Sequence, residues 1–216
     1  MDEIPQFLKD LKKTIIVQRS PELARPYEIA IMPAVTHLRQ QIKKEYQAQM
    51  RLQEERKQAI ISKLPIEVIE HLDEQSADYV DNEIFLQQQM AVIAEMRLVY
   101  FYKSYEIIFK QMLIDAYNAN TRNLFTLNSQ KSFLESKYIY PEKIVGYKEL
   151  NELRTVVNGI KHAPELGYHS KKIFEFSNAN QITYDSGTMF YERIEPQVNG
   201  YIEKLSELIF LSLYPV

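Results

Sequence analysis

Four side chains that could act on a phosphodiester lie close together in the segment "ELNELRTVVNGIKHAPELGYH", which spans residues 149–169. They are Arg154, Asn158, Lys161 and His162. An imidazole with a pKa near neutrality can move protons to and from a ribose 2′-hydroxyl or a leaving oxygen. A guanidinium binds phosphate oxygens in pairs and offsets the charge of the transition state, while an ammonium adds charge and an amide orients its neighbours. These residue types suit RNA cleavage without a metal ion.

The apolar residues around these four predict a helix that presents them together. At about 100° per residue, one face roughly 80° wide carries an apolar set. This set is Leu150, Leu153, Val157 and Ile160, and Val156 broadens it. The four polar residues form a separate stripe beside that face, and the carboxylates of Glu149 and Glu152 project away from it. Pro164 predicts that the helix ends at about His162 or Ala163.

Three more basic side chains follow in the next loop: His169, Lys171 and Lys172. They could form a basic rim that contacts RNA, or they could belong to a solvated turn. Because contacts between lysine and phosphate weaken as salt rises, a real rim predicts salt-dependent RNA binding.

The rest of the chain indicates an all-α protein. Five Gly and nine Pro in 216 residues are few turn-formers, which favours long helices with short connections. We predict an N-terminal helical arm in residues 1–80, beginning with a short helix at 4–17, and an up-and-down helical bundle in residues 81–216. In the arm, a polar helix over 27–63 is expected to pack through a narrow seam. The predicted seam is Ile42, Tyr46, Met50, Gln53 and Lys57.

In the bundle, apolar residues at three- and four-residue spacing predict a long helix over 83–118, capped by Asp81 or Asn82. A short helical piece after Pro65 is expected to precede it. The segment between Pro164 and the apolar C-terminal helix is predicted to be irregular, with short strands at 172–176 and 181–184.

Composition and charge exclude several classes of protein. A net charge of −3 argues against a general nucleic-acid binder and restricts any RNA contact to a local patch. The chain has no cysteine, no HExxH motif and no glycine-rich phosphate loop, so we expect neither a metal nor a cofactor. No apolar run approaches the length of a membrane helix and the N-terminus is charged, so we expect a soluble cytoplasmic protein.

The segment "ELRTVVNGIKH" resembles the signature helix of the HEPN superfamily, small all-helical domains that include RNases of toxin, anti-phage and CRISPR-associated systems. The order of helices over 82–214 is also similar. The resemblance implies that Arg154 and His162 are catalytic and that Asn158 and Lys161 support them. It further implies a homodimer with a composite cleft, and cleavage through the 2′-oxygen to a cyclic phosphate. Seven residues separate Arg154 from His162, one more than the usual upper limit, and Thr155 follows the arginine.

Three functions remain open at this point. The first is an endoribonuclease of toxin or defence type, held in check by an antitoxin or another regulatory partner. The second is a catalytically inactive module of the same fold that binds a nucleotide or a protein, which the long spacing favours. The third is a helical scaffold that assembles through its polar N-terminal helix.

Overall fold

The computed structural model describes residues 25–120, 122, 124, 126–163, 165–177 and 179–214. Over these residues the protein is all-α and contains no strand, which confirms the predicted fold class. The helices are α2 (Arg25–Ile61), α3 (Ile66–Tyr117), α4 (Leu127–Glu135), α5 (Tyr147–His162) and α6 (Tyr184–Leu213), with three 3₁₀ turns, η2 (Pro141–Lys143), η3 (Ser170–Lys172) and η4 (Phe174–Phe176). The helix predicted at 4–17 lies outside the described residues.

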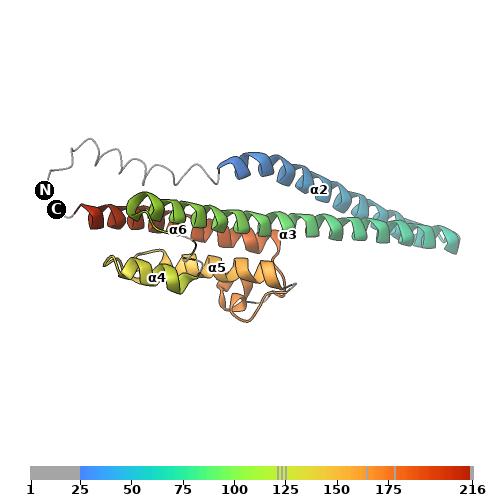
Figure 1. Ribbon diagram of the computed structural model, residues 1–216. Helices are drawn as coiled ribbons and strands as arrows, with labels where there is room; N and C mark the ends of the chain where they lie inside the picture. Colours follow the sequence, from blue (N-terminus) through green and yellow to red (C-terminus); the bar gives the residue numbers. More distant parts are fainter. Residues whose placement is uncertain are drawn as a thin grey trace.

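Helices α2 and α3 form a long antiparallel hairpin that extends beyond the rest of the molecule (Figure 1). Val35 and Leu38 of α2 are buried against Leu86 and Met90 of α3. Steps of three and four residues continue this contact toward the tip, as in a coiled coil. Near the tip, the guanidinium of Arg56 pairs with the carboxylate of Asp73.

The seam predicted for α2 is right at Ile42, which packs against this contact, and wrong from Tyr46 onward, because Tyr46 and Met50 are both about half exposed. The observed contact side follows Val35 and Leu38 in heptad steps, and polar residues such as Glu45 and Gln49 occupy it in the middle of α2. The predicted seam therefore departs from the observed one by one position after Ile42, where a polar residue, Glu45, takes the contact position.

The long helix begins earlier than its sequence predicted. Helix α3 runs without a break from Ile66 for 52 residues, about 78 Å, and Asp81 and Asn82 lie exposed inside it rather than capping it. The predicted cap was wrong because the residues of α3 that face α2 recur at three- and four-residue spacing on both sides of residues 81 and 82, so the helix continues through them. Helix α3 therefore joins the hairpin to the bundle as one rigid element.

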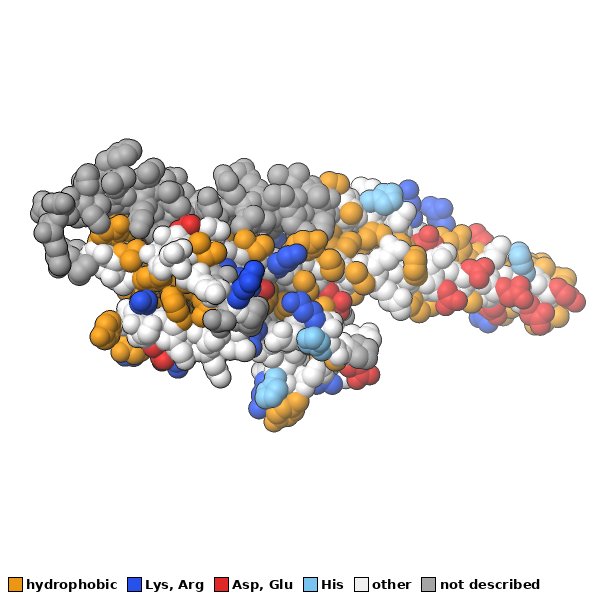
Figure 2. All heavy atoms as spheres, viewed as in Figure 1, with side chains coloured by type: hydrophobic (Ala, Val, Ile, Leu, Met, Phe, Trp, Pro, Cys, Tyr) orange, Lys and Arg blue, Asp and Glu red, His pale blue; other side chains and the backbone are white. Residues whose placement is uncertain are grey.

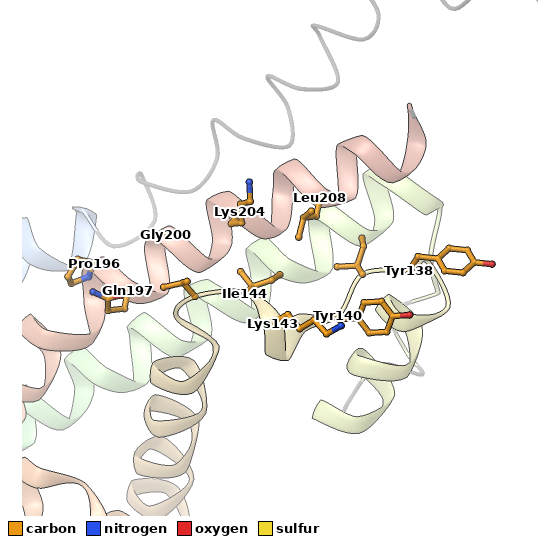
Figure 3. A pocket seen from close by; sticks show the side chains of 11 residues that line it. Tyr138, Tyr140, Lys143, Ile144, Pro196, Gln197, Gly200, Lys204 and Leu208 are labelled. Atoms are coloured by element: carbon orange, nitrogen blue, oxygen red, sulfur yellow. The ribbon is translucent and has the colours of Figure 1, made fainter. Parts of the chain in front are cut away.

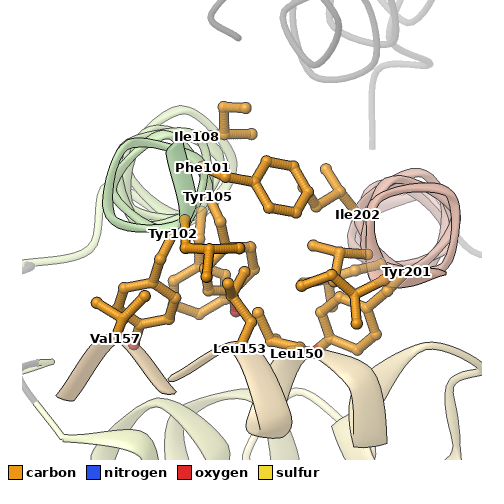
Figure 4. Packing of buried hydrophobic residues seen from close by; sticks show 14 of the residues in the cluster. Phe101, Tyr102, Tyr105, Ile108, Leu150, Leu153, Val157, Tyr201 and Ile202 are labelled. Carbon is orange, nitrogen blue, oxygen red and sulfur yellow. The ribbon is translucent and has the colours of Figure 1, made fainter. Parts of the chain in front are cut away.

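The main core lies where α3, α5 and α6 meet. Figure 4 shows side chains of α5 pointing between the other two helices. Leu150, Leu153, Val156 and Val157 are all buried, which confirms the core face predicted for α5. Opposite them, Tyr105 of α3 is buried and its ring lies 6.4 Å from that of Tyr201 of α6. This packing fixes how α5 is rotated, and hence which residues it exposes.

The two strands predicted between α5 and α6 are absent from the described residues. In the first segment Ile173 and Phe176 are buried while Phe174 is 82% exposed. Burial three residues apart is the period of a 3₁₀ turn rather than of a strand. In the second segment Thr183 is the N-cap of α6, and it exchanges hydrogen bonds with Ser186 in a capping box.

Candidate active site

Helix α5 presents the predicted stripe along one side. It ends at His162, as Pro164 predicted. Arg154 is half-buried, whereas Asn158, Lys161 and His162 are exposed. The stripe is therefore open to solvent along most of its length, and its first residue is the most buried of the four.

Arg154 contacts Tyr102 of α3, which the sequence did not single out, and Tyr102 also contacts Glu106 one turn further along α3. Burial raises the pKa of Tyr102 to about 12, the negative charge of Glu106 adds to that rise, and hydrogen bonding to Arg154 opposes it. The ammonium nitrogen of Lys161 lies 5.9 Å from the centre of the Tyr102 ring. Tyr102 therefore brings Arg154, Glu106 and Lys161 together at the edge of the stripe.

No pattern in the sequence distinguishes this tyrosine from its neighbours. Tyr100, Phe101, Tyr102 and Tyr105 form one aromatic cluster at helical spacing, a pattern more typical of a core than of a site. The only available signal was the four-residue step from Tyr102 to Glu106, which puts both on one side of α3. That spacing alone does not indicate a site, because the contact with Arg154 depends on the position of α5 beside α3.

The opposite side of α5 is held by a charged network. Arg193 of α6 donates from Nε to Glu175 at 2.6 Å and from Nη2 to Glu152 at 2.8 Å. Burial raises the pKa of Glu175, but hydrogen bonds from Arg193 and from the backbone outweigh it, so the pKa is lowered overall. The network links α5, η4 and α6, and it keeps Glu152 away from the stripe.

Glu175→Gln is expected to lower the free energy of unfolding by about 2 kcal/mol at neutral pH, because it removes charge-assisted hydrogen bonds from a buried side chain. Since the folded-state pKa of Glu175 is lowered, this stabilisation is present above the unfolded value of roughly 4 and is lost as pH falls through the folded one. Denaturant unfolding at neutral pH and at about pH 3 measures both effects. Glu207→Gln, which alters an exposed pair with Lys204, should change stability by less than about 0.5 kcal/mol. Equal losses in both variants would contradict the assignment.

The predicted basic rim lies beside the C-terminal half of α5. A Cβ on Gly159 would approach the Ser170 hydroxyl to 3.4 Å, so η3 packs closely against α5. Within this turn, Lys171 donates to Asn180 at 2.8 Å. Lys172 lies over the ring of Tyr168, with its nitrogen 4.4 Å from the ring centre, and His169 is exposed. His169 and Lys172 are therefore the two rim residues best placed to meet a ligand.

The stripe is surface rather than pocket. A hollow of about 550 Å³ lies elsewhere, between η2 and α6, and Figure 3 shows its lining side chains. Tyr138, Ile144 and Leu208 make it largely apolar, and none of the predicted site residues lines it. Among the described residues, no group of three or more His, Asp and Glu side chains could hold a metal ion. No helix in the described part of the chain has the length and apolarity to cross a membrane.

Comparisons with models of protein families, with curated proteins and with solved structures gave no match to this chain. The residues of α5 and their surroundings are therefore the basis for a function.

Proposed function

We propose that this protein is a metal-independent endoribonuclease of toxin or anti-phage defence type, with the HEPN-like site that the motif helix suggests. The observation that carries the proposal is the arrangement around Tyr102. Arg154 bonds to Tyr102 there, while Asn158, Lys161 and His162 stand exposed on the same side of α5. A guanidinium held in place and an exposed imidazole are the two groups that phosphodiester cleavage through the 2′-oxygen requires.

In this reaction His162 accepts the proton of the ribose 2′-hydroxyl, and the 2′-oxygen attacks phosphorus. The bond from phosphorus to the 5′-oxygen breaks, the 5′-oxygen takes up a proton, and the products are a 2′,3′-cyclic phosphate and a 5′-hydroxyl. Arg154 and Lys161 stabilise the additional negative charge on the phosphoryl oxygens. Asn158 orients the substrate.

The spacing within α5 supports a site shared by two copies of the chain. Eight positions separate the Cα atoms of Arg154 and His162 by ~12 Å along the helix axis. That is a long span for two groups that act at one phosphate. Asn158 is the midpoint of this span, so two α5 helices facing each other in opposite directions would place Arg154 of one copy opposite His162 of the other. A homodimer with two such pairs is the active form in this proposal.

Mixing two inactive variants tests this pairing. Arg154→Ala and His162→Ala should each be inactive as homodimers, whereas a mixed dimer contains one intact pair of Arg154 and His162. Random exchange makes half of the dimers mixed, with one intact site in each, so the equal mixture should recover roughly a quarter of wild-type cleavage.

A Lys148→Ala chain mixed with wild type is the control for the exchange procedure, because Lys148 is exposed on α5 outside the stripe. The mixture of Lys148→Ala and wild-type chains should keep full cleavage activity. If the mixture of Arg154→Ala and His162→Ala stays inactive while wild type cleaves RNA, the two residues do not act across the dimer.

The alternative is a catalytically inactive module that binds a nucleotide or a protein through the same stripe. The observation that favours it is the hydrogen bond between Arg154 and Tyr102, which leaves the guanidinium partly occupied within the chain. RNA bound with a salt-dependent affinity and recovered uncut would support this alternative.

A further inference from the structure

Helix α3 exposes an apolar stripe that no other helix in the described part of the chain buries. Five residues spaced at four-, seven- and eleven-residue steps define this α3 stripe, and they fall within an arc of roughly 60° around the helix. They are Phe85, Val92, Met96, Ile107 and Ile114, each between 40% and 58% exposed. The opposite side of α3 carries Leu98, Tyr105 and Met112, which are buried in the main core. Helix α3 therefore has two apolar faces, and the described residues bury only the face toward the main core.

The α3 stripe is self-complementary. Phe85 and Ile114 lie equally far from the point midway between residues 99 and 100, and so do Val92 and Ile107. A second copy related by a two-fold axis at that point would therefore place Phe85 against Ile114 and Val92 against Ile107. An interface with two-fold symmetry requires this relation, in which each residue meets its counterpart twice.

The charged residues of the stripe fit the same pairing. Lys103 would lie opposite Met96, and Lys110 opposite Gln89, so no lysine faces another lysine. The aliphatic part of Lys103 can cover Met96 while its ammonium group reaches water. The spacing thus pairs apolar side chains with one another and also keeps like charges apart.

The α3 stripe and the stripe of α5 belong to one face of the molecule. On the face seen in Figure 2, hydrophobic side chains follow α3, and Lys, Arg and His side chains gather below them over α5. Tyr102 of α3, which bonds to Arg154, connects the two. A molecule that docks on the α3 stripe is therefore brought next to Asn158 and His162.

We infer that a second copy of this chain docks on this face through the α3 stripe, and that this contact holds the two α5 helices at the shared site. The inference rests on the proposed function for the role of the site. The stretch from Phe85 to Ile114 is ~44 Å long and about 10 Å wide, and α5 adds ~24 Å of helix beside it. Together they offer roughly 700 Å² per copy, close to the ~800 Å² per partner of a typical stable interface.

Cysteine cross-linking tests the predicted contact, because the chain contains no cysteine of its own. Val92→Cys and Ile107→Cys chains are made separately, mixed and oxidised. The mixture should form a disulfide-linked dimer, while each variant alone should not, since two copies of either position would lie ~22 Å apart. Cross-linking in neither sample, or equally in each variant alone, would overturn the inference.

The mass in solution provides a second and independent readout. Wild type should be a dimer by light scattering. The mass of the double variant Val92→Glu with Ile107→Glu should be twofold lower, that of the 25.5 kDa monomer, and its helical circular dichroism should be unchanged. Ile61→Glu, at an exposed position near the hairpin tip, should remain dimeric. A monomeric wild type, or a double variant that stays dimeric, would overturn the inference.

These results separate the inference from the proposed function. A cross-linked dimer that leaves RNA intact supports the interface and argues against the RNase. RNA cleavage by a protein that is monomeric in solution supports the RNase and rules out this interface.

Discussion

His162→Ala is expected to reduce the rate of RNA cleavage by about 10²–10⁴-fold, the contribution typical of a positioned general acid or base. His162 is the last residue of α5 and is exposed, so its removal leaves no cavity and no unpaired buried group. The loss should therefore appear in activity while thermal stability stays within a few degrees of wild type. Single-turnover cleavage of a labelled RNA, with a melting curve for each variant, measures both.

His71→Ala is the matched control. His71 is also an exposed histidine on a helix, but it lies on α3 near the tip of the hairpin, where it bonds to Gln75. Its substitution should leave cleavage unchanged. If both variants lose activity equally, or if neither does, His162 is not the proton-transfer group of the proposed site.

Gly146→Ala is expected to destabilise the protein by roughly 3–5 kcal/mol, through backbone strain combined with overpacking. Gly146 is the N-cap of α5 and has φ +91°, a conformation that residues with a Cβ rarely adopt. A Cβ at this position would lie 2.2 Å from the backbone carbonyl oxygen of Gln197 on α6. The start of α5 therefore depends on glycine for its close contact with α6.

Gly200→Ala offers a control with the same change of residue. Gly200 lies within α6 and nothing approaches within 4 Å of a Cβ placed there. Since alanine favours a helix over glycine by about 1 kcal/mol, this variant should be as stable as wild type or slightly more so. Chemical denaturation of both variants measures the difference. A loss below about 1 kcal/mol for Gly146→Ala would show that α5 starts differently from this description.

The sequence predicted those parts of the fold in which burial follows a single apolar period. In α5, Leu150, Leu153 and Val157 recur at helical spacing, and all three are buried. The end of that helix was predictable as well, because Pro164 disfavours helical geometry in the residue before it. The composition also gave the correct all-α class.

Elsewhere the local pattern of residues and the tertiary contacts favour different structures, and the prediction from the local pattern was wrong. The α2 seam includes Glu45 and Gln49, so apolar residues did not mark it. The segment containing Ile173 and Phe176 is rich in residues that favour strands, yet its tertiary contacts select a 3₁₀ turn. The contact of Arg154 with Tyr102 depends on how α3 and α5 pack, and no property of either helix alone encodes it.

Cleavage of RNA in excess EDTA, comparing wild type with His162→Ala at matched fold and oligomeric state, tests whether the protein is a metal-independent RNase that depends on His162. We expect wild type to cut a mixed panel of RNAs without divalent metal, and the fragments to carry 2′,3′-cyclic phosphate and 5′-hydroxyl ends. His162→Ala should leave the same RNAs intact. Equal cleavage by both proteins, or intact RNA with dimeric wild type across the whole panel, would contradict it.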